Sequence, residues 1–206
     1  MRRRLIRAGM RSISLAVDVT NYVMLDLGQP MHAYDLDKIE GPIVVRRAAE
    51  GEKLTTLDGK EHDLSVEDLL ITDSPDGKRG SRILGIAGVM GGLYGEVTAD
   101  TKNILLEAAH FDSVSIARSA RRHKIPSEAS RRFERGVDTQ LQPAAAQMAA
   151  ELLTKFGNGE PSEHPTDVNT TMYRRPIPFK ATEVARVAGL DVDVNRRLCH
   201  GVDASA

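Results

Sequence analysis

The sequence has almost no capacity for disulfide bonds and no long apolar run. Cys199 is the single cysteine among 206 residues, which excludes a disulfide framework and favours a reducing cytoplasm. No apolar stretch approaches the length that spans a bilayer. The arginines after Met1 are not followed by the apolar core of a signal peptide. We therefore expect a cytoplasmic protein with no membrane partner.

Aromatic residues are also scarce: they make up 4% of the chain, and tryptophan is absent. This scarcity argues against a protein that binds single-stranded nucleic acid mainly by base stacking. The formal net charge is -1, so a nucleic-acid surface would have to come from local clusters of basic residues. The six histidines are scattered and the cysteine is unpartnered, so we expect no metal site. A Gly-x-Ser-x-Gly nucleophile motif is absent as well.

Helix signals are present in three places. Apolar positions recur at helical spacing after Ser14, a predicted N-cap, and Gly28 ends that helix. A second helix is predicted to begin at Asp112 or Ser113. A third is predicted to be capped by Asp138 and to continue to Phe156.

Strand signals occur between these helices, in short runs at residues 43–45, 54–57, 69–71 and 83–86. Asp58–Gly59 is typical of a two-residue hairpin turn. We therefore predict an α+β fold, with short strands in mixed or antiparallel sheets, a sandwich-like core and flanking helices. Residues 1–160 are predicted to form one module and 161–175 a linker. Residues 176–206 read as the incomplete start of a small helical domain with a further tail.

The run Asn103–Ala109 is apolar and of strand length, but it carries a carboxylate, Glu107. Burying an unpaired carboxylate is so costly that the group finds donors or takes up a proton. One interpretation is that strand alternation turns Glu107 to solvent. The other is that Glu107 points into a pocket and accepts a hydrogen bond from a ligand.

Two further stretches leave alternatives open. His32 follows a helix end and is flanked by strand formers, so it is either structural or part of a cleft. Residues 85–95 are rich in glycine, but they lack the spacing of a dinucleotide-binding or Walker-type loop. These glycines either form turns or allow a ligand to approach the backbone closely.

Basic residues are concentrated between Arg118 and Arg135, a segment that contains seven Arg or Lys and only two Glu. Arg118, Arg121 and Arg122 are spaced to share one helix face. The patch is either a solvated surface or a contact for nucleic-acid phosphates.

Several long motifs, taken together and in order, resemble the β subunit of bacterial phenylalanyl-tRNA synthetase. They are Asp18–Leu25, Gly28–Asp35, Gly88–Gly92, Asn103–Glu107 and Arg132–Asp138. The resemblance covers about residues 3 to 194, which corresponds to the editing module and the first residues of the small helical domain that follows. Residues 196–203 do not resemble the continuation of the family.

The resemblance implies hydrolysis of tyrosine that is wrongly esterified to phenylalanine tRNA. Glu107 falls on the residue that accepts the hydrogen bond of the tyrosine hydroxyl. Other editing-site residues of the family fall on Arg11, His32, Gly91, Ser127 and Ala129.

The resemblance also implies a role for each of these residues. His32 would position the terminal adenosine or the attacking water, and Ser127 would contribute its hydroxyl at a position where the family often has threonine. Gly91 and Ala129 would leave space for the aminoacyl group. Arg11 would steady the strand or the tRNA end.

Further implications concern cofactors and partners. The module would need no cofactor, metal or covalent nucleophile, because a positioned water hydrolyses the ester. ATP and Mg would serve an aminoacylation site elsewhere in the enzyme. The partners would be phenylalanine tRNA, contacted by Arg118, Arg121 and Arg122, and an α subunit in an α2β2 assembly. The alternative is a non-catalytic tRNA-binding or subunit-assembly module of the same synthetase. A free-standing hydrolase of small esters is disfavoured, because no nucleophile is recognisable.

Overall fold

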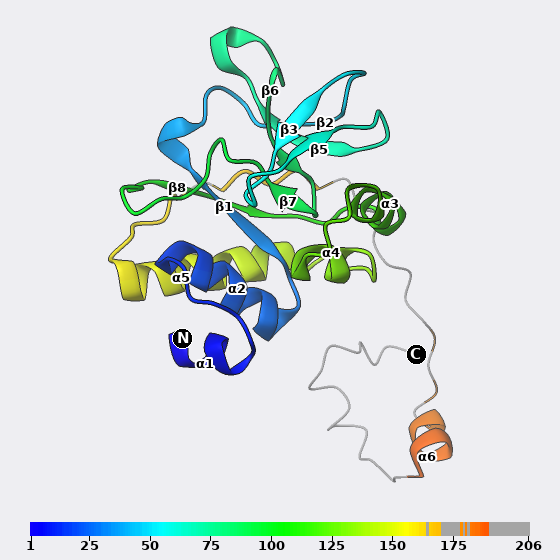
Figure 1. The fold of residues 1–206 in the computed structure, drawn as a ribbon. Coiled ribbons are helices and arrows are strands. Elements are labelled where there is room, and N and C mark those ends of the chain that lie inside the picture. Colours follow the sequence, from blue (N-terminus) through cyan, green and yellow to red (C-terminus); the bar gives the residue numbers. More distant parts are fainter. Residues whose placement is uncertain (164, 170–177, 179, 181, 190–206) are drawn as a thin grey trace. The chain divides into compact units, whose positions relative to one another are not determined.

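The computed structural model describes residues 1–163, 165–169, 178, 180 and 182–189 (Figure 1). The chain divides into two compact units, Met1–Pro165 and Thr166–Ala206. In the second unit the described residues form one helix, α6 (Thr182–Ala188). The predicted tail at 196–206, which includes Cys199, lies outside the described residues, as does part of the predicted linker.

The first unit has five α-helices within its described residues. They are α1 (Arg2–Arg7), α2 (Leu15–Leu27), α3 (Ser113–His123), α4 (Glu128–Phe133) and α5 (Gln142–Gly157). The predicted N-cap of α2 is confirmed, because the Ser14 side chain accepts a hydrogen bond from the backbone N–H of Val17. Gly28 ends α2 in the left-handed conformation, with φ of 78°. Asp112 caps α3 in the same manner as Ser14 caps α2.

The predicted N-cap of α5 was wrong. The helix begins at Gln142, and the Asp138 carboxylate accepts a hydrogen bond from the N–H of Gln140 in the preceding turn. Pro143 explains the late start, because proline lacks an N–H and is tolerated only in the first turn of a helix.

The described strands are short, and every pairing between them is antiparallel. β1 (Met31–Asp35) pairs with β8 (Ile104–Ala108). A four-stranded sheet has the order β2 (Val44–Arg47), β5 (Leu69–Asp73), β6 (Arg82–Ile86), β7 (Met90–Gly91). The hairpin of β3 (Lys53–Thr55) and β4 (Glu61–Asp63) contains the predicted Asp58–Gly59 turn. Short 3-10 helices lie at Leu36–Lys38 and Pro75–Gly77. The α+β fold class is therefore confirmed.

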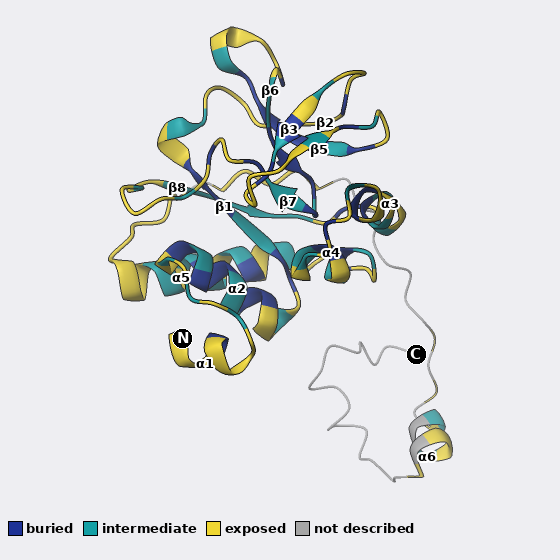
Figure 2. Cartoon of the chain, viewed as in Figure 1, coloured by how far each residue is buried: buried dark blue, intermediate teal, exposed yellow. Residues whose placement is uncertain are grey.

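The β1–β8 ribbon lies between two layers (Figure 1). On one side, α2 and α5 pack through buried residues such as Val19 and Ala145, and Leu106 of β8 joins them. On the other side lie the four-stranded sheet, α3 and α4, which form a larger core joined by Leu105 of β8 and Tyr34 of β1. Figure 2 shows the buried residues of these two cores. Both faces of β8 are therefore covered, and alternation does not turn Glu107 to open solvent.

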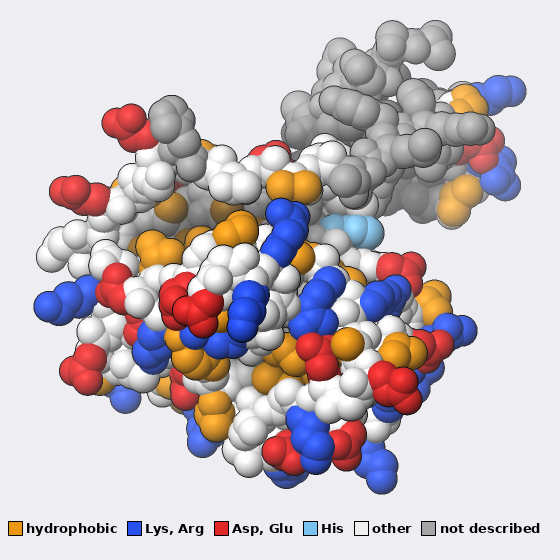
Figure 3. Space-filling model, turned by 90° about the horizontal axis from the view of Figure 1, so that it is seen from above, with side chains coloured by type: hydrophobic (Ala, Val, Ile, Leu, Met, Phe, Trp, Pro, Cys, Tyr) orange, Lys and Arg blue, Asp and Glu red, His pale blue; other side chains and the backbone are white. Residues whose placement is uncertain are grey.

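The surface carries charges of both signs. On the face shown in Figure 3, Lys and Arg side chains of the first unit are interspersed with Asp and Glu side chains. This mixture agrees with the formal net charge of -1.

Candidate functional site

The register of β1 and β8 brings two of the predicted site residues together. His32 pairs with Glu107, and Tyr34 pairs with Leu105. Side chains two residues apart on a strand share a face. His32 and Tyr34 therefore project on the same side of the ribbon as Glu107, toward the four-stranded sheet and α4.

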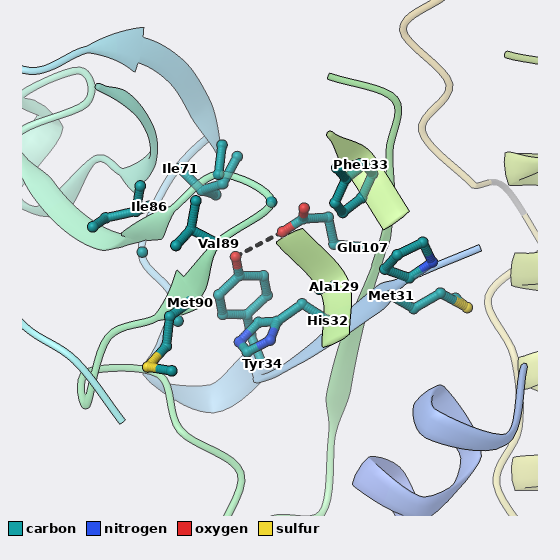
Figure 4. A pocket seen from close by; sticks show the side chains of 15 residues that line it. Met31, His32, Tyr34, Ile71, Ile86, Val89, Met90, Glu107, Ala129 and Phe133 are labelled. Atoms are coloured by element: carbon teal, nitrogen blue, oxygen red, sulfur yellow. Dashed lines mark hydrogen bonds between the residues drawn. The ribbon is translucent and has the colours of Figure 1, made fainter. Parts of the chain in front are cut away.

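This face borders a cavity of about 70 Å³ that is open to solvent (Figure 4). The polar side chains at its wall are His32, Tyr34 and Glu107. The remaining wall is apolar side chain or glycine, contributed by Pro30 and the start of β1, by β5, β6, the turn before β7, β7 itself, and α4. Examples are Ile71, Ile86, Met90, Ala129 and Phe133.

Glu107 is partly buried and accepts a hydrogen bond from a phenol. The hydroxyl of Tyr34 donates to Oε2 of Glu107 at 2.7 Å. Burial raises the pKa of Glu107, and the bond from Tyr34 acts in the opposite direction. Burial and the neighbouring carboxylate together raise the pKa of Tyr34 well above 10. The site thus holds a carboxylate at a place where a phenol hydroxyl can bind it.

His32 lies beside this pair. Its ring packs edge-on against the ring of Tyr34, with centroids 4.4 Å apart. Burial lowers the pKa of His32 to about 4, because the charged imidazolium loses its hydration. His32 is therefore neutral at physiological pH, and one ring nitrogen can accept a hydrogen bond.

Two glycines of this segment have different structural reasons, and the predicted approach of a ligand to the backbone stays a prediction. Gly88 has φ of 65° and forms the turn between β6 and β7. Gly91 is not among the glycines with positive φ, but a Cβ at this position would lie 2.7 Å from Cε1 of His32. Gly91 is therefore required by the close approach of the His32 ring, and both residues line the cavity.

Ser127 and Ala129 belong to the start of α4. Ala129 lines the cavity, but Ser127 is not among its lining residues. The Ser127 hydroxyl accepts a hydrogen bond from the N–H of Ser130 and donates one to the carbonyl of Val89 at 2.8 Å. Ser127 thus caps α4 and fastens it to the turn that carries the site glycines, and its hydroxyl is committed to these two bonds.

The remaining predicted residues lie away from the cavity. Arg11 is exposed in the loop between α1 and α2 and does not line the cavity. Arg118 and Arg121 are exposed on α3. Arg118 also lines a second cavity, of about 240 Å³, together with Arg47.

Arg122 differs from its neighbours because its guanidinium group forms ion pairs with Glu67 and with Asp68. Asp68 is fully buried, accepts a hydrogen bond from the Ser119 hydroxyl and pairs with His123. These contacts hold α3 against the segment before β5 and engage the Arg122 guanidinium, and the predicted contact of Arg122 with tRNA stays a prediction.

The sequence interpretation missed Tyr34 as a site residue. A signal was present, because Tyr34 stands two residues after His32 in a strand-forming stretch. Its bond to Glu107 joins positions 73 residues apart, which no local pattern reveals.

The described residues contain no group of three or more His, Cys, Asp or Glu side chains arranged to hold a metal ion. None of the helices in the described part of the chain combines the length and apolar character needed to cross a bilayer.

This chain is similar to a known domain family and to several phenylalanine–tRNA ligase β subunits. Residues 1–158 match the family model of the B3/4 domain. The phenylalanine–tRNA ligase β subunit of Bifidobacterium longum is 89% identical over 196 residues, or 95% of this chain and 23% of that protein. The corresponding subunit of Thermobifida fusca is 52% identical over 198 residues, or 96% of this chain and 23% of that protein.

A solved structure gives a weaker match. It is an N-terminal fragment of the phenylalanyl-tRNA synthetase β-subunit from Pyrococcus horikoshii, with 20% identity and a TM-score of 0.39. The match covers 52% of this chain and 39% of that one.

The chain spans 23% of the length of the two relatives from Bifidobacterium longum and Thermobifida fusca. The B3/4 match, in contrast, covers most of this chain. The chain therefore belongs to the B3/4 domain family and corresponds to part of a phenylalanine–tRNA ligase β subunit.

Proposed function

We propose that this chain hydrolyses tyrosine esterified in error to phenylalanine tRNA, as the editing part of a phenylalanine–tRNA ligase. One observation carries the proposal. In a cavity with mostly apolar walls, Glu107 accepts a hydrogen bond from a phenol hydroxyl. The phenol of Tyr34 is the same chemical group that distinguishes a tyrosyl ester from a phenylalanyl ester.

The need for such a site follows from the limits of apolar recognition. A hydrophobic pocket rejects a ligand that merely adds a hydroxyl by only about 10²-fold. A second site must therefore select for the hydroxyl. A charged acceptor can do so, because a hydrogen bond to a charged group contributes roughly 1.5–3 kcal/mol.

The chemistry requires little beyond positioning. Water adds to the ester carbonyl, and the ribose oxygen of the tRNA leaves with a proton. Neutral His32 has a nitrogen that can accept a hydrogen bond from the water or from the terminal adenosine. Gly91 and Ala129 present no bulky side chain at the cavity wall. Holding the reactants in this geometry supplies much of the rate.

The wider assignment follows from the relatives. ATP and Mg would serve an aminoacylation site elsewhere in the full enzyme, and this module would need no cofactor. The partners would be phenylalanine tRNA and a synthetase α subunit in an α2β2 assembly, in the cytoplasm.

The decisive experiment uses a complete synthetase. Residues 1–158 of this chain replace the matching segment of the Bifidobacterium longum β subunit, and the unmodified enzyme is the control. Aminoacylation of tRNA confirms assembly. We expect the hybrid to release tyrosine from tyrosyl-tRNA much faster than phenylalanine from phenylalanyl-tRNA. Equal release of both, or release of neither by an enzyme that aminoacylates, would contradict the proposal.

A non-catalytic tRNA-binding or assembly module is the second candidate. It is favoured by the exposed Arg118 and Arg121, and by the cavity that Arg118 forms with Arg47. Under this alternative the hybrid would bind tRNA through these residues, but would leave both esters intact.

A further inference from the structure

The hydrogen bond from Tyr34 engages one of the two carboxylate oxygens of Glu107. The Tyr34 hydroxyl donates to Oε2, whereas Oε1 accepts no hydrogen bond from any described residue. A carboxylate has about four acceptor positions on its two oxygens. Glu107 can therefore keep its bond to Tyr34 and accept a second phenol hydroxyl through Oε1.

Tyr34 is packed too firmly for a substrate to displace its hydroxyl from Glu107. Its side chain is 3% exposed and belongs to the larger core of the first unit. The backbone of Tyr34 is paired with Leu105, and its ring packs against the ring of His32. Removing the phenol from Glu107 would require opening this core.

The other groups near Glu107 make no hydrogen bond to its carboxylate in the described part of the chain. His32, across the ribbon, is neutral near physiological pH because burial lowers its pKa to about 4, and its ring packs against Tyr34. β5, β6, β7 and α4 contribute only non-ionisable residues to the cavity. α5 also packs against β8, but its ionisable residues, Glu151 and Lys155, are exposed. Tyr34 is thus the hydrogen-bond donor to Glu107 in the described part of the chain.

We propose that Tyr34 is a positioning residue for tyrosyl selection: it holds Oε2 of Glu107 and thereby presents Oε1 to the hydroxyl of the bound substrate. This inference rests on the proposed function. Tyr34 acts through Glu107 and need not contact the ester that is cleaved.

The substitution that tests the proposal is Tyr34→Phe, which removes one oxygen and keeps the ring. Without the donor, burial alone governs Glu107, and the carboxylate takes up a proton at higher pH. In the hybrid synthetase we expect the preference for tyrosyl-tRNA over phenylalanyl-tRNA to fall about tenfold at neutral pH. The preference should return as the pH is raised, so its pH profile moves upward. Tyr94→Phe, which removes a hydroxyl bonded to the carbonyl of Lys38, is the matched control.

A measurement without substrate separates this inference from the proposed function. Carboxyl carbon NMR of this chain should show the Glu107 titration moving to higher pH in Tyr34→Phe, and not in Tyr94→Phe.

An unchanged titration, or an unchanged pH profile of selectivity, would overturn the role of Tyr34 while leaving editing intact. Faster cleavage of tyrosyl-tRNA by Tyr34→Phe would also overturn it, because Tyr34 would then compete with the substrate. A hybrid that cleaves no ester although Glu107 shifts would instead count against the proposed function.

Discussion

The absence of a side chain at Gly91 provides the space that the imidazole of His32 occupies. A Cβ at position 91 would lie 2.7 Å from Cε1 and 2.8 Å from Nε2 of His32, closer than van der Waals contact permits. The two residues come from β7 and β1, which belong to different sheets. The position of His32 in the cavity is thus determined partly by a glycine on a neighbouring sheet.

Gly91→Ala should therefore displace His32 and slow deacylation. Overpacking of this kind typically costs 1–3 kcal/mol of stability, and a misplacement of about 1 Å can cost about 10²-fold in rate. We expect a loss of about ten- to a hundredfold in the release of tyrosine, with a folded protein. Gly159→Ala is the control, because its Cβ would meet nothing closer than 3.7 Å. Full activity of Gly91→Ala would show that the position of His32 does not matter for hydrolysis.

Replacing His32 itself tests whether it positions the reactants. His32→Ala should slow deacylation at saturating substrate by about 10²-fold or less, since it removes a positioning group and no covalent nucleophile. Circular dichroism should show that the variant is folded, and His110→Ala, at an exposed position, is the control. A variant that unfolds would make His32 a structural residue.

The burial of His32 also predicts a pH dependence of stability. Its pKa is about 4 in the folded protein and 6.5 as a free side chain, so the unfolded chain binds more protons between these values. The free energy of unfolding should therefore fall as the pH drops from 6.5 toward 4. The contribution of His32 is at most about 3 kcal/mol.

Chemical denaturation at several pH values measures this effect. The pH dependence should be weaker in His32→Ala than in the parent chain, and the difference between the two curves isolates His32. Identical curves would show that the imidazole is not desolvated in the folded protein.

The basic residues of α3 should divide into two groups. Arg118 and Arg121 are exposed, so neutralising either to Gln should reduce the salt dependence of tRNA binding by roughly 0.7 to 0.9 in logarithmic slope per lost phosphate contact. Arg122→Gln should leave the slope unchanged. It should instead destabilise the fold by about 1–3 kcal/mol, because buried Asp68 loses a charged partner.

The control for these variants is Arg79→Gln, in the exposed loop before β6. If the salt dependence of tRNA binding has the same slope in the parent chain, Arg118→Gln and Arg121→Gln, then α3 does not contact tRNA. A reduced slope in a stable Arg122→Gln would show that its ion pairs open when tRNA binds.

The features that the sequence predicted correctly are those with local causes. Ser14 and Gly28 bound α2 because capping and left-handed geometry act within a few residues. The Asp58–Gly59 turn is equally local. The N-cap role predicted for Asp138 was wrong, because an Asp side chain can cap either a turn or a helix. Here it caps a turn, since Pro143 must lie in the first turn of α5. Local patterns thus predicted α2, α3 and α5 and several of the strands, including the strand that carries Glu107, but not the short helices α1 and α4.

The site was less predictable, because its contacts join distant segments. The resemblance placed His32, Gly91, Glu107 and Ala129, and the structure brings these four residues to one cavity. Tyr34 was missed because its partner depends on the β1–β8 register. The bond from Ser127 to Val89 and the ion pair from Arg122 to Asp68 span 38 and 54 residues. A hydroxyl or guanidinium in a sequence does not reveal whether such a distant partner has engaged it.

Glu107 is predicted to recognise the tyrosine hydroxyl and to leave the hydrolysis to the positioned water. Glu107→Ala in the hybrid synthetase removes the acceptor, so the hydroxyls of both the substrate and Tyr34 lose their partner. On hydrogen-bond magnitudes this should cost roughly 1.5–3 kcal/mol, or about ten- to more than a hundredfold in kcat/KM for tyrosyl-tRNA. The phenylalanyl ester has no such hydroxyl and should lose much less.

The ratio of the two kcat/KM values is therefore the quantity to measure. Glu107→Gln is the matched variant, because it keeps the shape and a neutral acceptor oxygen but removes the charge. It should retain more of the preference than Glu107→Ala, and its preference should vary less with pH, since the side chain no longer titrates. If Glu107→Ala slows the cleavage of both esters equally, Glu107 serves the reaction or the fold, and tyrosine selection must come from another part of the cavity.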